Sequence, residues 1–305
     1  MNRSSLTLLT PTYHRDLDRF ALQRESIERC AIDLPHLAIV NTEDLPLFQK
    51  IPFKKNLTLL TTRDVLGKTM DRRRQVWRVS RKDYRYWITP AGIPGWLAQQ
   101  LLKLAAPAFI STDSFLCLDS DAFFVDHLTA ADFHAPDGRL HLYETSDDLD
   151  LEMAEWYAHS LRFLGIKETG VPLRRFTHAP VPMHCQLVKD MQTLIEQRHH
   201  MPWMEAIITG DRIMEYTTYG AYARHVDQLK TVAPIAPQIA LYYWWKHETE
   251  NLLENLDARL AASRAKIILI NSNIGLSHDE CRRAAHRAWE RTPHASHRPE
   301  PALIS

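Results

Sequence analysis

The side chains best suited to chemistry in this sequence are two aspartates separated by one serine, Asp119-Ser120-Asp121. Two carboxylates at that spacing in an extended chain can bind one hard divalent cation and leave positions open for phosphate oxygens. Asp-Ser-Asp is also ordinary turn chemistry. Here the triplet lies between the apolar runs FLCL and AFFV, which indicate a buried turn, and buried carboxylates need a counter-ion. We therefore predict a Mn²⁺ or Mg²⁺ site at Asp119 and Asp121.

Glycine is scarce, and this scarcity excludes the commonest nucleotide sites. The chain has nine glycines in 305 residues and none before Gly67. A dinucleotide-binding turn needs three glycines after the first strand, and a P-loop at this place would need a glycine where Thr62 stands. If the protein binds a nucleotide, a metal ion is the obvious alternative for neutralising the phosphates.

The net charge is zero, with 37 basic and 37 acidic residues, so no overall field steers the protein toward nucleic acid or an anionic membrane. The charges are nevertheless segregated, because residues 68–85 carry eight Lys or Arg and only two Asp. Within this run, Arg72, Arg73 and Arg74 form either a solvated face or a recognition site for an anionic acceptor or a diphosphate.

The cysteines and the N-terminal segment indicate where the protein resides. The four cysteines have neither the paired spacing of a zinc site nor a disulfide pattern, so we expect reduced, buried thiols. The apolar stretch in the opening MNRSSLTLLTPTY is too short for a signal sequence, and no later apolar stretch is long enough to span a membrane. We expect a cytoplasmic protein.

The elements that must position these residues follow from the hydrophobic pattern. Strands are expected at 6–9, 36–40, 56–60, 115–118, 140–143 and 267–270. Helices are expected at 16–30, 96–104, 186–196, 215–226 and 248–262. Strands that alternate with helices favour a mainly parallel sheet with crossover connections. The tail from Ala284, rich in Arg, His and Pro, is expected to be flexible.

Three stretches resemble a known superfamily: LTLLTPTYHRDLDRFALQRESIER near the start, GWLAQQLLKLAAP followed by FLCLDSDAFF, and MEYTTYG at 214–220. The first two resemble glycosyltransferases of GT-A architecture, in which a helix with polar residues precedes the strand that delivers an Asp-x-Asp motif. The third resembles a Ser-Glu-Tyr-x-x-Tyr-Gly segment of a poorly characterised bacterial group, with Met214 in place of the serine.

The resemblance implies a single GT-A-like, Rossmann-like α/β domain, in which helices flank a mixed, mainly parallel sheet. A nucleotide-sugar-binding half would span 1–126, an acceptor-binding and catalytic half 127–283, and the tail 284–305. The implied activity is metal-dependent transfer of a sugar from a nucleoside diphosphate sugar to a glycan, a lipid-linked glycan or another hydroxyl acceptor, as in bacterial surface polysaccharide synthesis. Nucleic acid is not an expected partner, whereas peripheral membrane contact is compatible with this activity.

The resemblance places the donor at the carboxyl ends of the first strands, with its diphosphate on the cation at Asp119, Ser120 and Asp121. Candidate contacts to the base and the ribose follow the first two strands and are Thr10, Thr12, Tyr13, Glu43 and Asp44. Candidate contacts to the donor sugar or phosphate lie on the preceding helix and are Gln99, Gln100 and Lys103. Each of these residues has a structural alternative, as a turn residue or as a solvated position on a helix.

The acceptor side needs further groups. Transfer with inversion, which we favour, requires a carboxylate that deprotonates the acceptor hydroxyl, for which Glu215 is the first candidate and Asp211 the second. A helix N-terminus also stabilises a carboxylate that has no catalytic role, and retaining transfer needs no such base. A third metal ligand is expected at His247, with His278 second. The candidates for acceptor binding are His184, Trp244 and Trp245.

Two other functions remain open from the sequence. A nucleotidyltransferase or phosphohydrolase would use the same metal carboxylates, often with further acidic ligands nearby, such as Asp126. A non-catalytic binding module would use the acidic triplet only to end a strand.

Overall fold

The computed structural model describes residues 6–31, 33–82, 93–146, 150–167, 170, 172–210, 213–249 and 252–291, without the side chains of residues 76–82. A central sheet of five strands has the order β3-β2-β1-β4-β7. Its parallel strands are β1 (Leu6–Thr12), β2 (His36–Val40), β3 (Leu57–Thr61) and β4 (Ser114–Cys117). The edge strand β7 (Val181–His184) is antiparallel to β4.

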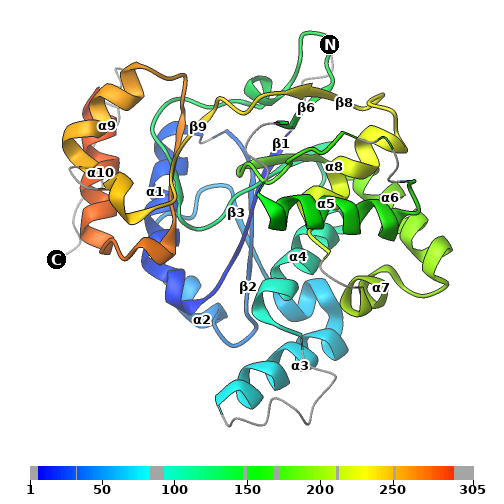
Figure 1. Ribbon diagram of the computed structural model, residues 1–305. Coiled ribbons are helices and arrows are strands. Elements are labelled where there is room, and N and C mark those ends of the chain that lie inside the picture. The colour runs from blue at the N-terminus through cyan, green and yellow to red at the C-terminus, as the bar shows by residue number, and fades with distance from the viewer. Residues whose placement is uncertain are drawn as a thin grey trace.

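The central strands are apolar runs because helices cover both faces of the sheet. Every residue of β1, β2 and β4 is buried. On one side of these strands lie α9 (Leu252–Ala261) and α10 (His278–Arg291), and on the other lie α5 (Leu151–Leu164), α6 (Cys185–His199) and α8 (Glu215–His225) (Figure 1). The mixed α/β architecture with a mainly parallel sheet is therefore the predicted one.

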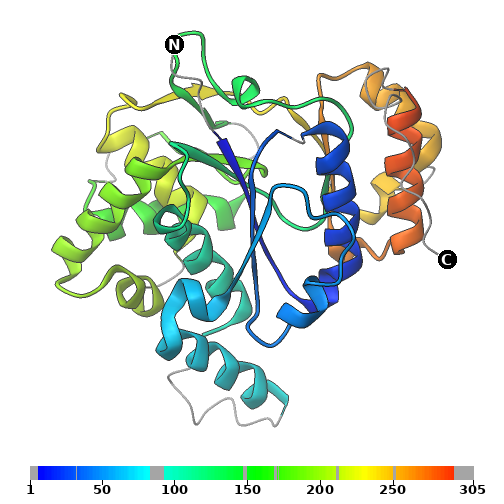
Figure 2. The ribbon, with the colours of Figure 1, turned by 180° about the vertical axis from the view of Figure 1, so that it is seen from behind.

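The remaining helices complete these layers. They are α1 (Leu17–Cys30), α2 (Leu45–Phe48), α3 (Thr62–Lys82), α4 (Gly95–Ala105) and α7 (Trp203–Thr209). Seen from behind, α1 lies beside α10 (Figure 2). The guanidinium of Arg29 lies 4.5 Å from the ring centroid of Trp289, which joins these two helices.

Two smaller sheets extend the fold. The strands β5 (Ala122–Phe124), β10 (Ile267–Ile270) and β9 (Ala240–Tyr243) form one of them, in that order. The other pairs β6 (Leu140–Tyr143) with β8 (Val232–Ile235). Because β5 begins directly after Asp121 and pairs with β10, the acidic triplet connects the central sheet to the first small sheet.

The strands expected at 36–40, 140–143 and 267–270 have the predicted bounds, and the helices expected at 16–30, 96–104, 186–196 and 215–226 lie within three residues of theirs. The helix expected at 248–262 is instead a 3₁₀ turn (Lys246–Thr249) followed by α9. The tail predicted from Ala284 was placed too early. Residues up to Arg291 belong to α10, which buries Ala284, Ala285, Ala288 and Trp289, whereas 292–305 lie outside the described residues.

Two further expectations concern the cysteines and the membrane. All four cysteines are free and buried, as predicted. No helix in the described ranges is both long enough and apolar enough to cross a membrane.

Candidate active site

The carboxyl ends of the four parallel strands meet at one edge of the central sheet, and the acidic triplet lies at this edge. Asp119 is two residues beyond the end of β4. The chain still follows β1 at this point, because the Leu118 N–H donates to the Leu9 carbonyl at 2.8 Å and the Thr12 hydroxyl donates to Ser120 Oγ at 3.3 Å. Open α/β sheets bind their ligands at this edge.

The two carboxylates of the triplet have different surroundings. The Asp119 side chain is 43% exposed. Asp121 accepts a hydrogen bond on Oδ2 from the Ser272 N–H at 3.1 Å, while its Oδ1 is buried and has no hydrogen-bond partner within the described chain. Burial of the carboxyl, followed by the charge of Asp119, raises the pKa of Asp121 to about 7. The charge of Arg19 and the hydrogen bond from Ser272 offset these effects only in part. A divalent cation shared with Asp119 would stabilise the ionised form of Asp121 further.

Lys103 of α4 joins Asp119 to Glu215. Its Nζ lies 3.4 Å from Asp119 Oδ1 and 3.0 Å from Glu215 Oε1, with side-chain exposures of only 6% for Lys103 and 3% for Glu215. The ammonium also lies 4.5 Å from the ring centroid of Tyr216. Burial alone would lower the pKa of Lys103, but the charges of Asp119 and Glu215 and the neighbouring Tyr216 hold it well above its ordinary value. Lys103 is thus a fixed cation between two carboxylates.

Glu215 begins α8 and is held by α4. Its N–H donates to Gln100 Oε1 at 3.1 Å, and its Oε1 accepts from Lys103. Its Oε2 is buried and has no hydrogen-bond partner among the residues that the structure describes. Gln100 and Lys103, predicted as donor contacts, therefore position Glu215 in this structure, whereas the half-buried Gln99 makes no such contact with it.

Several residues predicted to contact the nucleotide sugar instead form hydrogen bonds within the protein. The fully buried Thr10 donates to Gln23 Oε1 at 3.0 Å and lies 3.0 Å from His36 Nε2, so its hydroxyl does not face the edge. The buried Asp44 accepts from the N–H of His14 at 3.0 Å, which makes it a turn residue. Both side chains are thus hydrogen-bonded within the protein, and their contacts to the base or the ribose stay predictions. Thr12 is also buried, and its hydroxyl orients Ser120.

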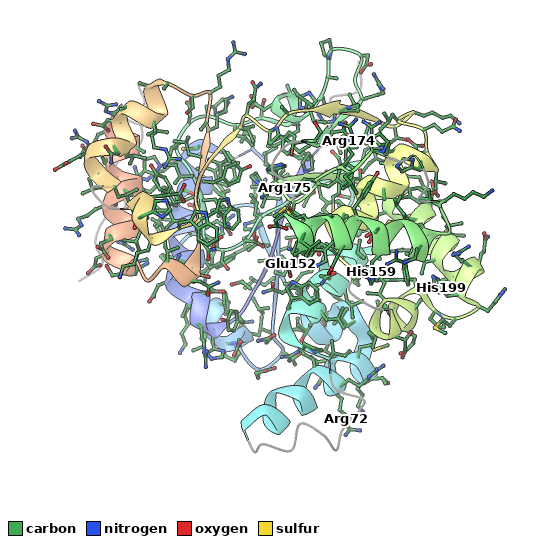
Figure 3. The ribbon with its side chains drawn as sticks, viewed as in Figure 1. Arg72, Glu152, His159, Arg174, Arg175 and His199 are labelled. Carbon is green, nitrogen blue, oxygen red and sulfur yellow. The ribbon has the colours of Figure 1, made fainter. Side chains whose placement is uncertain are left out.

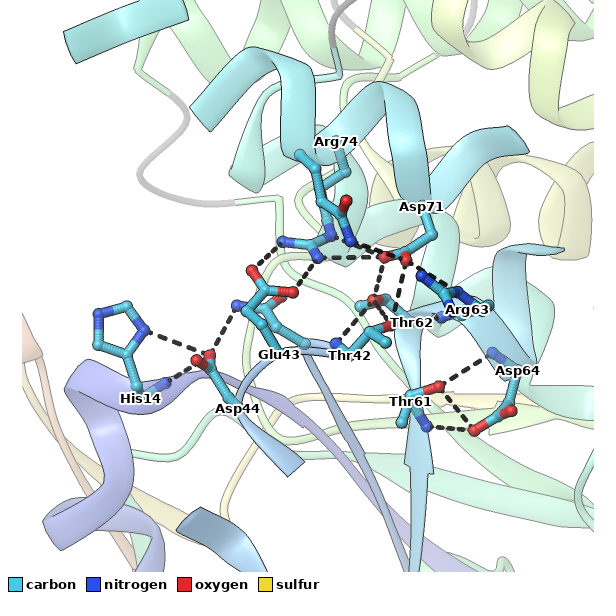
Figure 4. A network of polar contacts seen from close by, with 12 residues as sticks. His14, Thr42, Glu43, Asp44, Thr61, Thr62, Arg63, Asp64, Asp71 and Arg74 are labelled. Atoms are coloured by element: carbon cyan, nitrogen blue, oxygen red, sulfur yellow. Dashed lines mark hydrogen bonds and ion pairs between the residues drawn. The ribbon is translucent and has the colours of Figure 1, made fainter. Parts of the chain in front are cut away.

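Glu43 belongs to an ion-pair network at the ends of β2 and β3 (Figure 4). Arg74 donates to Glu43 Oε2 at 2.7 Å and to Asp71 Oδ1 at 3.1 Å. Asp71 is fully buried and also accepts from Thr42 at 3.1 Å and from Thr62. This network thus engages Glu43 at the strand ends. Of the predicted base and ribose contacts, the half-buried Tyr13 is the one whose side chain has no hydrogen bond to the part of the chain that the structure describes.

The three arginines of the basic run have separate roles. Arg74 points inward to the network of Figure 4, and Arg73 pairs with Glu205 of α7 at 2.8 Å. Arg72 is exposed at the lower margin of the molecule, far from Arg174 and Arg175 beside α5 (Figure 3). The interpretation as a solvated face therefore fits Arg72 alone.

The predicted histidines do not gather at the acidic triplet. His184 pairs with Ser114, at the opposite end of β4 from Asp119, because β7 runs antiparallel. His184 therefore lies away from the acidic triplet, and its role in acceptor binding stays a prediction. His247 is exposed in the 3₁₀ turn after β9, and the described ranges contain no group of three or more His, Cys, Asp or Glu that could hold a metal ion. Neither His247 nor His278 thus completes a metal site in this structure, and Asp211 lies outside the described residues.

The two tryptophans lie at the end of β9, next to the strand that supports Asp121. Tyr243 pairs with Ile270 of β10, whose N–H donates to the Asp121 carbonyl at 3.1 Å. The Trp244 ring is stacked on Tyr242 at 6.0 Å, and Trp245 is 66% exposed. Trp245 thus presents an aromatic face to solvent near the candidate site.

Sequence reasoning missed the residues that hold the triplet in place. Gln23 of α1 donates to the backbone carbonyls of Asp119 and Ala122, and Ser272 donates to Asp121. The one available signal was a run of four polar residues, Gln23 to Ser26, in the middle of a predicted amphipathic helix. All four prove to be buried.

This sheet topology, with an acidic triplet at the carboxyl edge, defines a GT-A-type fold. The apo structure of the bifunctional glycosyltransferase WbbM is similar, with a TM-score of 0.52 and 12% identity over 96% of this chain and 53% of that one. The present chain thus spans about half the length of WbbM. Two other solved structures are less similar. Mouse xyloside xylosyltransferase 1, in its apo form, has a TM-score of 0.49 and 10% identity over 90% of this chain and 100% of that one. The galactosyltransferase LgtC, in complex with donor and acceptor sugar analogs, has a TM-score of 0.47 and 11% identity over 92% of this chain and 95% of that one.

The chain belongs to a family of unknown function (DUF6492), which matches residues 5–274. No curated protein matches it at a significant level.

Proposed function

We propose that this protein is a metal-dependent glycosyltransferase that moves a sugar from a nucleoside diphosphate sugar to a hydroxyl acceptor. One arrangement carries the proposal: Lys103 joins the solvent-accessible Asp119 to the buried Glu215, beside an Asp121 oxygen without a partner in the described structure. The fold supports it, since WbbM, a glycosyltransferase, has a similar one. By the resemblance of the sequence, the acceptor would be a glycan or lipid-linked glycan of a bacterial surface.

Asp119 and Asp121 are the residues that would hold Mn²⁺ or Mg²⁺. They offer hard oxygen ligands: the Asp119 side chain is reachable from solvent, and Asp121 has a buried oxygen without a hydrogen-bond partner in the described structure. When bound, the cation would neutralise the negative charge that develops on the departing diphosphate. This arrangement would replace the glycine-rich phosphate cradle that the sequence lacks.

Glu215 is the proposed base of an inverting transfer. The acceptor oxygen forms a bond to the sugar carbon, the bond from that carbon to the diphosphate breaks, and the acceptor proton passes to Glu215 Oε2. Lys103 occupies Oε1, whereas Oε2 has no partner in the described ranges. Because Oε2 is buried, the proposal requires that acceptor binding exposes it.

Replacement of Glu215 tests this role. Glu215→Gln keeps the shape of the side chain but removes its basicity, so transfer should fall by about 10²- to 10⁴-fold while the affinity for the donor stays within a few fold. Nucleotide-sugar binding by calorimetry and product formation by chromatography would be measured on the same sample. A loss of donor affinity, with residual turnover, would reassign Glu215 to binding.

The structure gives no support to the phosphohydrolase or nucleotidyltransferase alternative from Asp126, the acidic residue that had favoured it. Asp126 lies beyond β5, at the opposite end of that strand from Asp121, and accepts a hydrogen bond from the His127 N–H. A nucleotidyltransferase or phosphohydrolase that acts on a nucleoside diphosphate sugar would break the bond between its two phosphates and release a sugar phosphate, and a binding module would retain the nucleotide without turnover. The product released from a nucleotide sugar therefore separates all three functions.

A further inference from the structure

The turn that carries the two aspartates accepts two hydrogen bonds from one buried side-chain amide of a helix that is distant in sequence. Gln23, in the middle of α1, is fully buried. Its Nε2 donates to the Asp119 carbonyl at 2.7 Å and to the Ala122 carbonyl at 3.0 Å. Because these two residues bracket Ser120 and Asp121, both hydrogens of a single amide group hold the two ends of the turn.

The amide is itself oriented by a chain of buried hydrogen bonds. Burial and the charge of Arg24 lower the pKa of His36 well below its ordinary value, so its ring is neutral. Arg24 donates to His36 Nδ1 at 2.8 Å, which places the ring proton on Nε2, 3.0 Å from the Thr10 hydroxyl. Thr10 in turn donates to Gln23 Oε1 at 3.0 Å. The direction of every bond is thus fixed, and the Gln23 amide cannot flip without leaving a buried group unsatisfied.

We infer that Gln23 is a positioning residue for the proposed metal site, which sets the relative placement of the Asp119 and Asp121 carboxylates. The inference rests on the proposed function, since it concerns the same pair of carboxylates. A side chain that donates to both ends of a turn fixes the backbone from which two metal ligands project. Groups that orient ligands in this way commonly change metal affinity by about 10- to 100-fold when removed.

Another residue of the same helix provides a matched control. Ser26 is also fully buried, donates to the Gln23 carbonyl at 2.6 Å and accepts from the Phe124 N–H at 3.0 Å. It therefore ties α1 to β5 by a side-chain bond of the same kind, but it does not touch the Asp119–Ala122 turn. Loss of Ser26 should reduce stability without moving the carboxylates.

The experiment measures Mn²⁺ affinity in the absence of nucleotide, by electron paramagnetic resonance or calorimetry, together with urea unfolding. Gln23→Met removes both donated hydrogen bonds at similar side-chain volume, and we expect Mn²⁺ affinity to fall by at least about tenfold. Ser26→Ala should keep Mn²⁺ affinity within about twofold of the wild type, by the same reasoning, despite its own loss of stability. Equal Mn²⁺ affinity for Gln23→Met and the wild type would overturn the inference, as would an equal loss in both variants.

The outcome separates this inference from the proposed function. If the wild type binds Mn²⁺ and Asp121→Asn does not, the metal site stands and only the role of Gln23 is in question. If the wild type binds no Mn²⁺, both proposals fall. If Gln23→Met does not fold, Thr10→Val replaces it, since this near-isosteric change removes the donor that orients the amide. A Thr10→Val protein with unchanged Mn²⁺ affinity would then overturn the inference.

Discussion

Ionisation of Asp121 destabilises the folded protein, and a bound cation would relieve this cost. Its pKa is about 7 in the folded protein, against an ordinary value of 3.8, because its carboxyl is buried and Asp119 lies beside it. The folded state therefore binds this proton more tightly than the unfolded chain does. The free energy of unfolding that this proton contributes is fully present below the ordinary pKa of 3.8 and is lost as the pH rises from there through about 7.

The metal-free protein should thus lose stability at Asp121 between about pH 4 and pH 7, and Asp121→Asn should flatten this part of the profile. Above about pH 7 the substitution should stabilise the metal-free protein by at most about 4 kcal/mol, since each pKa unit corresponds to about 1.4 kcal/mol. Urea unfolding with a chelator at about pH 4 and about pH 8 measures this effect, with the exposed Asp33→Asn as control. An Asp121→Asn profile as steep as that of the wild type would contradict the assignment.

The buried pair of Lys103 and Glu215 makes a second prediction. Lys103→Met leaves a buried carboxylate without its cation and should cost about 3–5 kcal/mol of unfolding free energy. Adding Glu215→Gln to that variant removes the buried carboxylate that has lost its cation. The double variant should therefore lose less unfolding free energy than the sum of the losses in the two single variants. A double-mutant cycle by urea unfolding measures the difference, and strict additivity would show that the two residues do not interact.

Which site residues the sequence predicted depends on how local their signals are. The two aspartates follow an apolar run and Glu215 opens a recognisable helix, so local pattern located all three. Gln23 could not be found in this way, because its partners Asp119 and Ala122 lie 96 and 99 positions away. The hydrogen-bond partners of Thr10 and Asp44 were missed for the same reason, since proximity to the end of a strand does not show which way a side chain hydrogen bonds.

At the scale of elements, α8 has little room for change on its inner face. A Cβ atom added at Gly220 would lie 2.3 Å from the ring of Phe176, which is itself buried. Gly220→Ala should therefore destabilise the protein by about 1–3 kcal/mol through overpacking, although alanine is the better helix former by about 1 kcal/mol. Thermal unfolding measures the loss, and adding Phe176→Leu should recover part of it. A more stable Gly220→Ala protein would show that α8 and Phe176 do not pack as described.

Elements were predictable where the apolar pattern was dense and were missed where charge concealed it. The strands β1, β2 and β4 of the central sheet are nearly continuous apolar runs and were predicted, with exact bounds for β2, whereas the edge strand β7 was not predicted. By contrast, α10 lies in a stretch rich in Arg and His, and its buried face consists of small residues such as Ala284 and Ala288. The helix α3 was also missed, because Gly67, at φ 77° and ψ 164°, interrupts it and its sequence reads as a basic run.

At the scale of the whole molecule, the neutral charge reflects local pairing rather than an even distribution. Arg73 and Arg74 of the basic run are paired with Glu205 and Glu43, which join α3 to α7 and to the end of β2. The topology brings residues as far apart in sequence as Lys103, Asp119, Glu215 and Ser272 to one edge of the sheet. That convergence depends on the fold and is the basis of the proposed function.

The most direct test of that function is nucleoside diphosphate release from a panel of nucleotide sugars, with and without Mn²⁺, by the wild type and Asp121→Asn. We predict that at least one sugar donor yields the diphosphate only when Mn²⁺ is present, and that Asp121→Asn, although folded, releases none above background. Metal-independent release by the wild type, or undiminished release by Asp121→Asn, would contradict the proposed site.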